Sequence, residues 1–192
     1  MSDARIAAVV LAAGGSTRMG QPKVLLDIDG EPLIARVVRV ATEAGLAPIV
    51  VVAGAEIDRL RSVLGASRAR VVENRSWAEG LASSICCGIE TLSSECDAAV
   101  LLLGDQPLVT PDHIRDLTAA FGRGHDPVAT RYGEGRGVPV LFGSRWFAEL
   151  RSLSGDRGAR DLLEREQCAV VGDGSPPLDI DTPADYERLR RR

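Results

Sequence analysis

Runs of residues that are apolar throughout, separated by amphipathic segments, constrain the fold of this chain more than any other feature of its sequence. Three such runs fall at residues 6–13 (IAAVVLAA), 48–53 (PIVVVA) and 98–103 (AAVLLL). A strand that is apolar throughout buries both faces, as in parallel sheets that are covered by helices on each side. We therefore expect an α/β fold with a doubly wound, mostly parallel sheet and helices on both faces.

Shorter apolar runs continue this alternation toward the C-terminal end. The predicted strands are Ile6–Ala13, Pro48–Ala53, Arg70–Glu73, Ala98–Leu103, Pro127–Arg131, Val138–Phe142 and Cys168–Val171. Between strands, residues 31–45 and 110–122 carry apolar side chains at helical spacing. The second of these segments begins with Thr110, a suitable N-cap, and ends with Gly122, a suitable stop. At 192 residues, the chain is expected to form a single domain, residues 1–192.

Charge and hydropathy exclude two classes of partner. The formal net charge is −4, whereas binding to the phosphate backbone of nucleic acids needs a basic surface. No apolar stretch approaches the roughly 18 residues that a membrane-spanning helix requires. We therefore expect a cytoplasmic protein with no nucleic acid and no membrane as partner. The four cysteines, Cys86, Cys87, Cys96 and Cys168, lack the spacing of a zinc site and are interpreted as small buried hydrophobes.

A glycine-rich, basic segment follows the first predicted strand and reads LAAGGSTRMGQPK, residues 11–23. It does not match the Walker pattern, because Gln21 and Pro22 stand where Lys and Ser or Thr would follow the second glycine. Small residues let backbone N–H groups approach a ligand closely, and the cations Arg18 and Lys23 can hold a multiply charged group from two sides. The segment predicts a triphosphate-binding loop, the alternative being a surface loop with incidental charges.

Carboxylates follow one buried strand and precede the last predicted helix. Asp105 comes two residues after the apolar run 98–103. Magnesium prefers one or two carboxylates together with substrate phosphates, so Asp105 is a candidate metal ligand, with a turn or capping residue as the alternative. Asp179 and Asp181 share one face of an extended segment before a helix that begins at 182–183. One of them is expected to cap that helix, and Asp181 could instead bind the metal of Asp105.

Three segments, LAAGGSTRMGQPK, LLGDQP and DIDTPADY, occur in this order across nearly the whole chain. Together they resemble the MobA-like nucleotidyltransferases of the molybdenum cofactor, and most of all the cytidylyltransferase branch. The resemblance implies a Rossmann-like fold of the nucleotide-diphospho-sugar transferase type. It further implies transfer of a nucleoside monophosphate from CTP or GTP to the phosphate of molybdopterin, with release of pyrophosphate. Mg²⁺ would be the cofactor, and a molybdoenzyme would be a transient partner.

The same resemblance implies roles for individual residues. The base and sugar would be lined by Leu11, Ala12, Ala13 and Gly14, and the phosphates would be held by Gly15, Arg18 and Lys23, beside the small hydroxyl of Ser16. Magnesium would be bound by Asp105 and Asp181. The nucleotide or acceptor would lie near Asn74, Gly80, Ser83 and Ser84, and the acceptor side would include Gly137, Pro139, Gly155, Asp156, Gly158 and Arg160. Val138 departs from the polar residue that the family commonly has there, which leaves the identity of the acceptor open.

The sequence shows no Ser-His-Asp or Cys-His arrangement. His113 and His125 are interpreted as structural or solvated, and Trp77 as a residue that fills space under a loop, with stacking on a base or pterin as the alternative. An anionic acceptor phosphate can attack the α-phosphorus directly, so positioning and charge neutralisation suffice. Two alternatives remain. One is a nucleotidyltransferase that acts on a sugar phosphate or other small phosphorylated acceptor, and the other is a non-catalytic nucleotide-binding module.

Overall fold

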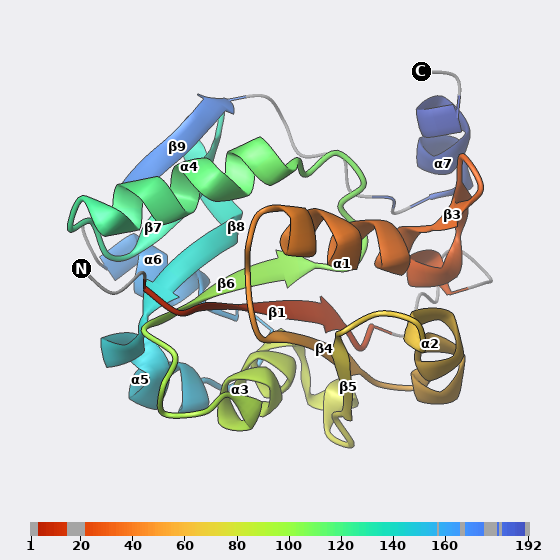
Figure 1. The fold of residues 1–192 in the computed structure, drawn as a ribbon, viewed down its shortest axis with the longest axis horizontal. Coiled ribbons are helices and arrows are strands. Elements are labelled where there is room, and N and C mark those ends of the chain that lie inside the picture. Colours follow the sequence, from red (N-terminus) through yellow and green to blue (C-terminus); the bar gives the residue numbers. More distant parts are fainter. Residues whose placement is uncertain are drawn as a thin grey trace.

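The computed structural model describes residues 4–14, 22–156, 158–165, 168–174, 180 and 182–190. Its main element is a seven-stranded sheet in the order β5-β4-β1-β6-β8-β7-β9, with helices on both faces (Figure 1). The strands of this sheet are β1 (Ile6–Ala12), β4 (Ile49–Ala53), β5 (Arg70–Glu73), β6 (Ala98–Leu103), β7 (Val128–Tyr132), β8 (Gly135–Gly143) and β9 (Ala169–Gly174). A separate antiparallel pair consists of β2 (Asp27–Ile28) and β3 (Glu31–Pro32).

Helices connect most of the strands. The α-helices are α1 (Leu33–Glu43), α2 (Ile57–Leu64), α3 (Leu81–Thr91), α4 (Pro111–Gly122), α5 (Phe147–Arg151), α6 (Arg160–Arg165) and α7 (Pro183–Arg190). Short 3-10 helices are η1 (Lys23–Leu25), η2 (Trp77–Glu79) and η3 (Ser144–Trp146). Helices α1 and α4 cover one face of the sheet, and α3 and α5 cover the other (Figure 1).

The predicted fold class is confirmed, and every predicted strand is present. Strands β5, β4, β1 and β6 are parallel, and β9 is parallel to β7. Strand β8 is the exception, because it runs antiparallel to both β6 and β7. It begins at Gly135, earlier than the predicted start at Val138, since a tight turn joins β7 and β8 into a hairpin. Backbone pairing with β7, rather than an apolar pattern, defines these first residues of β8.

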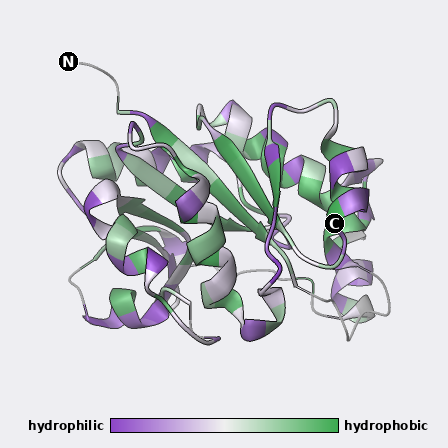
Figure 2. Cartoon of the chain, turned by 90° about the horizontal axis from the view of Figure 1, so that it is seen from below, coloured by the Kyte–Doolittle hydropathy of each residue, from purple (hydrophilic) through white to green (hydrophobic). Residues whose placement is uncertain are grey.

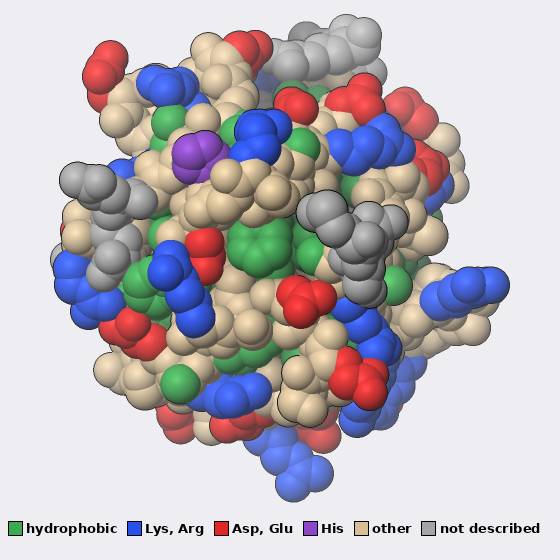
Figure 3. Space-filling view, turned by 60° about the vertical axis from the view of Figure 1, so that its left-hand side comes forward, with side chains coloured by type: hydrophobic (Ala, Val, Ile, Leu, Met, Phe, Trp, Pro, Cys, Tyr) green, Lys and Arg blue, Asp and Glu red, His purple; other side chains and the backbone are tan. Residues whose placement is uncertain are grey.

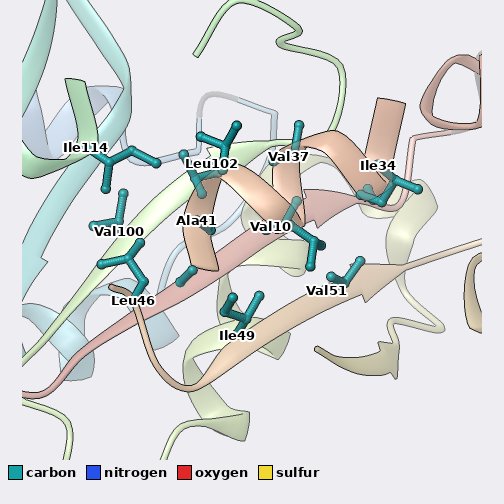
Figure 4. Packing of buried hydrophobic residues seen from close by; sticks show 14 of the residues in the cluster. Val10, Ile34, Val37, Ala41, Leu46, Ile49, Val51, Val100, Leu102 and Ile114 are labelled. Atoms are coloured by element: carbon teal, nitrogen blue, oxygen red, sulfur yellow. The ribbon is translucent and has the colours of Figure 1, made fainter. Parts of the chain in front are cut away.

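The central strands are buried from both sides, as their continuous apolar sequences require. Along β1, Ala8 and Val10 pack with α1 and α4, whereas Ala7 and Val9 pack in the cluster on the α3 and α5 side. Figure 4 shows the first cluster, in which Val10 lies among side chains from α1 and β4. Hydrophobic residues accordingly concentrate along the strands (Figure 2). Because the buried parallel strands hold their carboxyl ends together at one edge of the sheet, the loops that follow them can form a ligand-binding site.

The helix ends follow their expected capping residues with one difference. The Thr110 side chain accepts a hydrogen bond from the His113 N–H at 3.2 Å, which confirms Thr110 as the N-cap of α4. Gly122 is the last residue of that helix, but it is not the residue that turns the chain. Gly124 takes the positive φ of +94°, because an αL residue is needed only after the C-cap position, which Arg123 occupies.

Among the described residues, no helix is both long and apolar enough to cross a membrane. The face of the molecule in Figure 3 mixes basic with acidic side chains, and hydrophobic side chains show between them. All four cysteines are free, and only Cys96 is fully buried. The interpretation as buried hydrophobes is therefore correct for Cys96 and only partly correct for the others. Burial raises the pKa of the Cys86 and Cys87 thiols, which keeps them protonated near neutral pH.

The contact between α3 and β1 gives a test of the packing. A Cβ atom at Gly88 would collide with Val9 Cγ1 and lie 3.1 Å from Val52 Cγ2. We expect Gly88→Ala to lower the free energy of unfolding by about 1–3 kcal/mol, because the core has no room for the methyl group. Urea denaturation measures this. The matched control is Gly122→Ala on α4, where a Cβ would meet nothing within 4 Å and stability should be unchanged or slightly higher. Equal losses in both variants would contradict the packing argument.

Candidate functional site

Two charged side chains meet at the edge of the sheet where β1 and β6 end. Lys23 lies in η1, and Asp105 follows β6 after a single residue. The distance from Lys23 Nζ to Asp105 Oδ2 is 3.8 Å, and the two side chains are 16% and 25% exposed. Both charges are therefore partly shielded from water and still within reach of a ligand. Lys23 is also the only lysine in the sequence, and all other residues among its lysines and arginines are arginine.

Gly104 allows this close approach. Its N–H donates to Leu11 O at 2.9 Å, which ties the start of the 104–110 loop to the end of β1. A Cβ atom at position 104 would lie 3.1 Å from Val24 Cγ1 in η1. That distance is tighter than ordinary contact, so a larger residue would push η1 away from the loop. The glycine therefore sets the spacing between Lys23 and Asp105.

The predicted nucleotide-binding residues at the end of β1 divide into a buried and an exposed part. Leu11, Ala12 and Ala13 are buried, and Gly14 is exposed with open space around it. The Ala13 carbonyl points at Gly54, where a Cβ atom would approach its oxygen to 2.5 Å. The backbone of this segment, rather than its side chains, is thus what a ligand would meet. The remaining predicted residues of the loop, Gly15, Ser16 and Arg18, lie outside the described residues.

The last segment of the chain returns to Asp105. The Ile180 N–H donates to Asp105 O at 3.4 Å, and Ile180 itself is fully buried. Asp179 and Asp181 flank Ile180 in the sequence, and both lie outside the described residues. The proposed metal role of Asp181 therefore stays a prediction.

Thr182 caps the final helix, and Asp179 and Asp181, one of which was expected to do so, lie outside the described residues. The Thr182 N–H donates to Asp185 Oδ2 at 2.8 Å, and the Asp185 N–H donates to Thr182 Oγ1 at 3.3 Å. This reciprocal pair is a capping box, in which Thr182 is the N-cap and Asp185 supplies the acidic partner. The pattern was present in the sequence as Thr182 followed three residues later by an acid, and the position immediately before the helix takes the cap.

Asn74 connects β5 to the start of α3. Its Nδ2 donates to Ser83 Oγ at 2.9 Å and to Ser84 Oγ at 3.0 Å, and its Oδ1 accepts from the Ser76 N–H at 3.0 Å. The Asn74 N–H donates to Ala53 O at the end of β4. Asn74 and Ser84 are 5% and 4% exposed. The structure therefore brings these predicted residues together, and their mutual hydrogen bonds make them a positioning network for the loop between β5 and α3.

Gly80, Gly155 and Asp156 also meet, although they are distant in sequence. The Ala82 N–H donates to Gly155 O at 3.1 Å, which satisfies a donor in the first turn of α3. Gly80 has a φ of +109°, and a Cβ atom there would collide with Asp156 Oδ1. A pocket of about 510 Å³ lies beside this contact, lined among others by Asn74, Ser83 and Gly155. Two residues of the predicted acceptor side, Gly155 and Asp156, therefore lie against the segment that contains Asn74, Gly80 and Ser83.

The other predicted acceptor residues lie apart from this surface. Arg160 is the first residue of α6 and lines a separate pocket of about 590 Å³. Pro139 lines a third pocket of about 440 Å³, and Gly158 packs against Leu81, to whose Cδ2 a Cβ at 158 would approach within 2.9 Å. Gly137 lies beside the ring of Tyr132. Gly155, Pro139 and Arg160 therefore line three different pockets, and the acceptor role of these residues stays a prediction.

Trp77 packs under the loop, as its first interpretation predicted. A Cβ atom at Gly54 would lie 2.7 Å from the Trp77 ring, so the indole occupies the space that the glycine leaves after β4. Trp77 is partly exposed. Its stacking on a ligand is not tested by this contact.

His113 forms a hydrogen bond that places a hydrogen on its Nε2 atom. Thr130 donates its hydroxyl proton to Pro139 O at 2.6 Å, so the 2.7 Å contact from His113 Nε2 to Thr130 Oγ1 requires that Nε2 carries a hydrogen. Burial lowers the pKa of His113, against the raising effects of Asp116 and Asp173. The structural interpretation of His113 is therefore confirmed. His125 is exposed after α4, which agrees with a solvated residue.

Asp105 could supply one carboxylate ligand to a divalent cation. Among the described residues, no group of three or more His, Cys, Asp or Glu side chains is arranged to hold a metal ion. Mg²⁺ is usually bound by one or two carboxylates plus water and substrate phosphates, rather than by a cage of protein ligands. A single partly exposed carboxylate at Asp105 is compatible with magnesium, whose other ligands would be water and substrate phosphates.

The fold and the charged edge together define a class of protein. A mostly parallel sheet carries a glycine-rich loop and a carboxylate at the carboxyl ends of adjacent strands, which is where open α/β sheets bind their ligands. The class is that of nucleotide-binding transferases. A family model for the MobA-like NTP transferase domain matches residues 8–170. The chain belongs to this family, and nucleotidyl transfer is the family's activity.

Known proteins of similar sequence and structure agree with the family. The purine catabolism protein PucB of Bacillus subtilis is 31% identical over 95% of each chain. The crystal structure of Rv0371c from Mycobacterium tuberculosis has a TM-score of 0.86 and 32% identity, covering all of both chains. A second Rv0371c structure, described as a complex with manganese, has a TM-score of 0.80 and 31% identity over 97% of this chain and 98% of that one.

A more distant structure shares the fold alone. It is the molybdopterin-guanine dinucleotide biosynthesis protein A of Archaeoglobus fulgidus, with a TM-score of 0.72 and 18% identity over 96% of each chain. The predicted family and the predicted nucleotide-diphospho-sugar transferase type of fold are thus confirmed.

The Asn74 network can be tested by removing its centre. Asn74→Ala would leave the Ser84 hydroxyl and the Ser76 N–H without their partner in a buried site. We expect a loss of about 2–4 kcal/mol in the free energy of unfolding, since each unsatisfied buried group costs about 1–3 kcal/mol. Urea denaturation measures the loss. Ser67→Ala is the control, because that hydroxyl bonds within an exposed turn and its removal should cost less than about 1 kcal/mol. A loss at Asn74 no larger than the control's would show that the network does not hold the loop.

Proposed function

We propose that this protein transfers a nucleoside monophosphate from CTP or GTP to the phosphate of molybdopterin, with release of pyrophosphate. The observation that carries the proposal is the pair formed by Lys23 and Asp105 at the edge of the sheet, 3.8 Å apart and partly shielded from water. The choice of acceptor rests on the resemblance of the three motifs to molybdenum cofactor nucleotidyltransferases. The Archaeoglobus protein, which shares the fold, is named for molybdopterin-guanine dinucleotide biosynthesis, and this name supports the same choice of acceptor.

Joining a phosphate to a triphosphate brings two polyanions together, and repulsion between them is the main electrostatic obstacle. Lys23 lies directly after the glycine-rich loop, so its ammonium group would neutralise phosphate charge in the substrate and in the departing pyrophosphate. Arg18 would add a second cation from the same loop. A preorganised cation of this kind stabilises charge that develops in the transition state. An attacking phosphate is already anionic near neutral pH, so no general base is required.

Asp105 and Asp181 would hold Mg²⁺, which would supply charge neutralisation at the reacting phosphates. In the apo protein the Lys23 ammonium lies 3.8 Å from the Asp105 carboxylate, so each charge offsets the other at a partly buried edge. Binding of the triphosphate would let Lys23 turn from Asp105 to the phosphates. The carboxylate would then become available as a ligand at the moment when substrate arrives.

The base and sugar would lie over the backbone at Leu11, Ala12, Ala13 and Gly14. Gly80, Ser83 and the Asn74 network would form the wall next to them, with Gly155 and Asp156 packed against it. Asn74 and Ser84 are too buried for extensive ligand contact, so their proposed role is to position the loop. Arg160 would reach the acceptor from α6.

The first test removes the carboxylate. Asp105→Ala is expected to lower turnover at least about a hundredfold, in line with the loss of a preorganised charge-stabilising group. The measurement is pyrophosphate release on mixing protein, magnesium, CTP or GTP and molybdopterin. Asp97→Ala is the control, because Asp97 follows the 93–96 turn at the opposite end of β6. Turnover of Asp105→Ala near that of the unaltered protein at saturating magnesium would contradict the assignment.

The same assay separates the proposed function from its alternatives. Release of pyrophosphate with a sugar phosphate but not with molybdopterin would show that the acceptor is a sugar phosphate. No release with any acceptor, despite tight nucleotide binding, would identify a nucleotide-binding module.

The second test uses the unique lysine. Lys23→Ala is expected to weaken triphosphate binding and to slow the reaction, because the cation would contact the phosphates in both the ground and transition states. Titration calorimetry with CTP, GTP, ATP and UTP in the presence of magnesium measures the change and identifies the preferred base.

Amine-specific acetylation provides an independent reading of the same contact. Lys23 is the only lysine, so the α-amino group is the only other amine in the chain and serves as an internal control. The preferred triphosphate should protect Lys23 from acetylation and leave the α-amino group reactive. Unchanged binding by Lys23→Ala, together with no protection, would make Lys23 a structural charge only.

A further inference from the structure

Two arginines oppose each other across the hairpin formed by β7 and β8. Arg131 and Arg136 are register partners in this antiparallel pair. Like charges at directly opposite positions destabilise an antiparallel sheet. Both side chains are exposed, so water and salt screen part of this repulsion. An acidic neighbour or a bound anion would supply the remaining compensation.

The protein's own acidic residues do not supply it. Within the described part of the chain, neither Arg131 nor Arg136 forms an ion pair, whereas nearby arginines do: Arg145 with Asp126 at 2.7 Å and Arg165 with Glu149 at 2.5 Å. Arg136 Nη1 donates instead to the Cys168 thiol at 3.3 Å. This contact is a weak hydrogen bond to sulfur and not an ion pair. The repulsion within the pair is therefore uncompensated by the described side chains.

A third arginine lines the same pocket as Arg131 and Arg136. Arg160 of α6 lines the pocket of about 590 Å³ that Arg131 and Arg136 also line. Arg160 forms no ion pair with a described residue either. Glu134 and Glu164 lie on the pocket wall as well, but neither forms an ion pair with any of the three arginines. We name this site the arginine pocket, defined by Arg131, Arg136 and Arg160.

The arginine pocket lies on the same edge of the sheet as Asp105. Leu101 of β6, Val140 of β8 and Ala129 of β7 form one row across the three strands. Between this row and Arg131, the pairing of β7 with β8 shifts register at Ala129 and Thr130. Because β8 is antiparallel to both β6 and β7, strand β7 runs in the same direction as β6. Arg131, near the end of β7, therefore lies toward the edge of the sheet at which β6 ends and Asp105 follows.

We propose that the arginine pocket binds an oxyanion and that this oxyanion is the phosphate of the acceptor. Guanidinium groups suit this ligand because their planar donors bind oxyanions in a bidentate way. Arg160 is already an expected acceptor residue, and Arg131 and Arg136 are new ones. The oxyanion site stands on the arrangement of the three arginines, while its link to the acceptor rests on the proposed function.

The first experiment measures anion binding without any substrate. Thermal unfolding of the unaltered protein is compared with that of the double variant Arg131→Gln/Arg136→Gln, at low ionic strength and with increasing sodium sulfate. Sulfate should raise the Tm of the unaltered protein more than that of the double variant. The control variant is Arg68→Gln, because Arg68 is exposed in a loop and forms no ion pair with a described residue. It should respond to sulfate as the unaltered protein does.

Stability without anion provides a reading that a purely structural role would not give. If the pair is held for a ligand, Arg136→Gln should raise the Tm at low ionic strength by about 1–3 °C, because it removes a cross-strand repulsion. A lower Tm for Arg136→Gln, or an equal sulfate response in all variants, would overturn the proposed site.

The second experiment tests the link to the acceptor. The double variant should raise KM for molybdopterin at least tenfold and change KM for the nucleoside triphosphate less than twofold. An unchanged KM for molybdopterin, with the sulfate response still lost, would refute the acceptor role and leave the oxyanion site. If the unaltered protein released no pyrophosphate with molybdopterin, the proposed function would fail, while the sulfate comparison would still decide whether the oxyanion site exists.

Discussion

The ion pair between Lys23 and Asp105 is the interaction on which the proposed chemistry of this fold depends. Lys23 begins η1 and Asp105 follows β6, and the two side chains are only 16% and 25% exposed. A partly desolvated charge is costly without a partner, so each residue makes the other tolerable before substrate binds. Gly104 sets their spacing, because its missing side chain lets η1 pack against the loop after β6. In the apo protein, a cation and a carboxylate thus lie together at the edge of the sheet where a triphosphate would bind.

The choice of lysine at this position has a physical reason. The sequence contains a single lysine among its basic residues and uses arginine everywhere else. A guanidinium beside Asp105 would form a bidentate pair and stay with the carboxylate, whereas an ammonium is a compact charge on a flexible stem. The 3.8 Å separation is longer than a direct hydrogen bond. A weak, mobile pair is easier to exchange for phosphate contacts than a bidentate pair would be.

Sequence patterns predicted the elements of the fold because each depends on local periodicity, as in β1, β4 and β6. They also singled out Lys23, at the end of the segment after β1, and Asp105, after β6, and the structure places the two side chains 3.8 Å apart. Contacts between distant segments were not predictable in this way. The packing of Gly155 and Asp156 on Gly80 depends on backbone approach. Thr182 caps α7 through a reciprocal capping box with Asp185, which satisfies two donors. Arg131 and Arg136 were missed for the same reason, because their opposition exists only once the hairpin register is known.

The two basic sites at this edge differ in how their charge is balanced, and that difference suggests a division of labour. Lys23 has a carboxylate partner that a metal would claim, so its charge is released only when nucleotide and metal bind together. The arginine pocket has no such partner among the described residues, so its charge is available to a ligand at all times. An acceptor that enters through the arginine pocket would be held before the nucleotide site is complete. Its reacting phosphate would then meet the triphosphate within a fixed geometry, which is the source of rate enhancement that positioning provides.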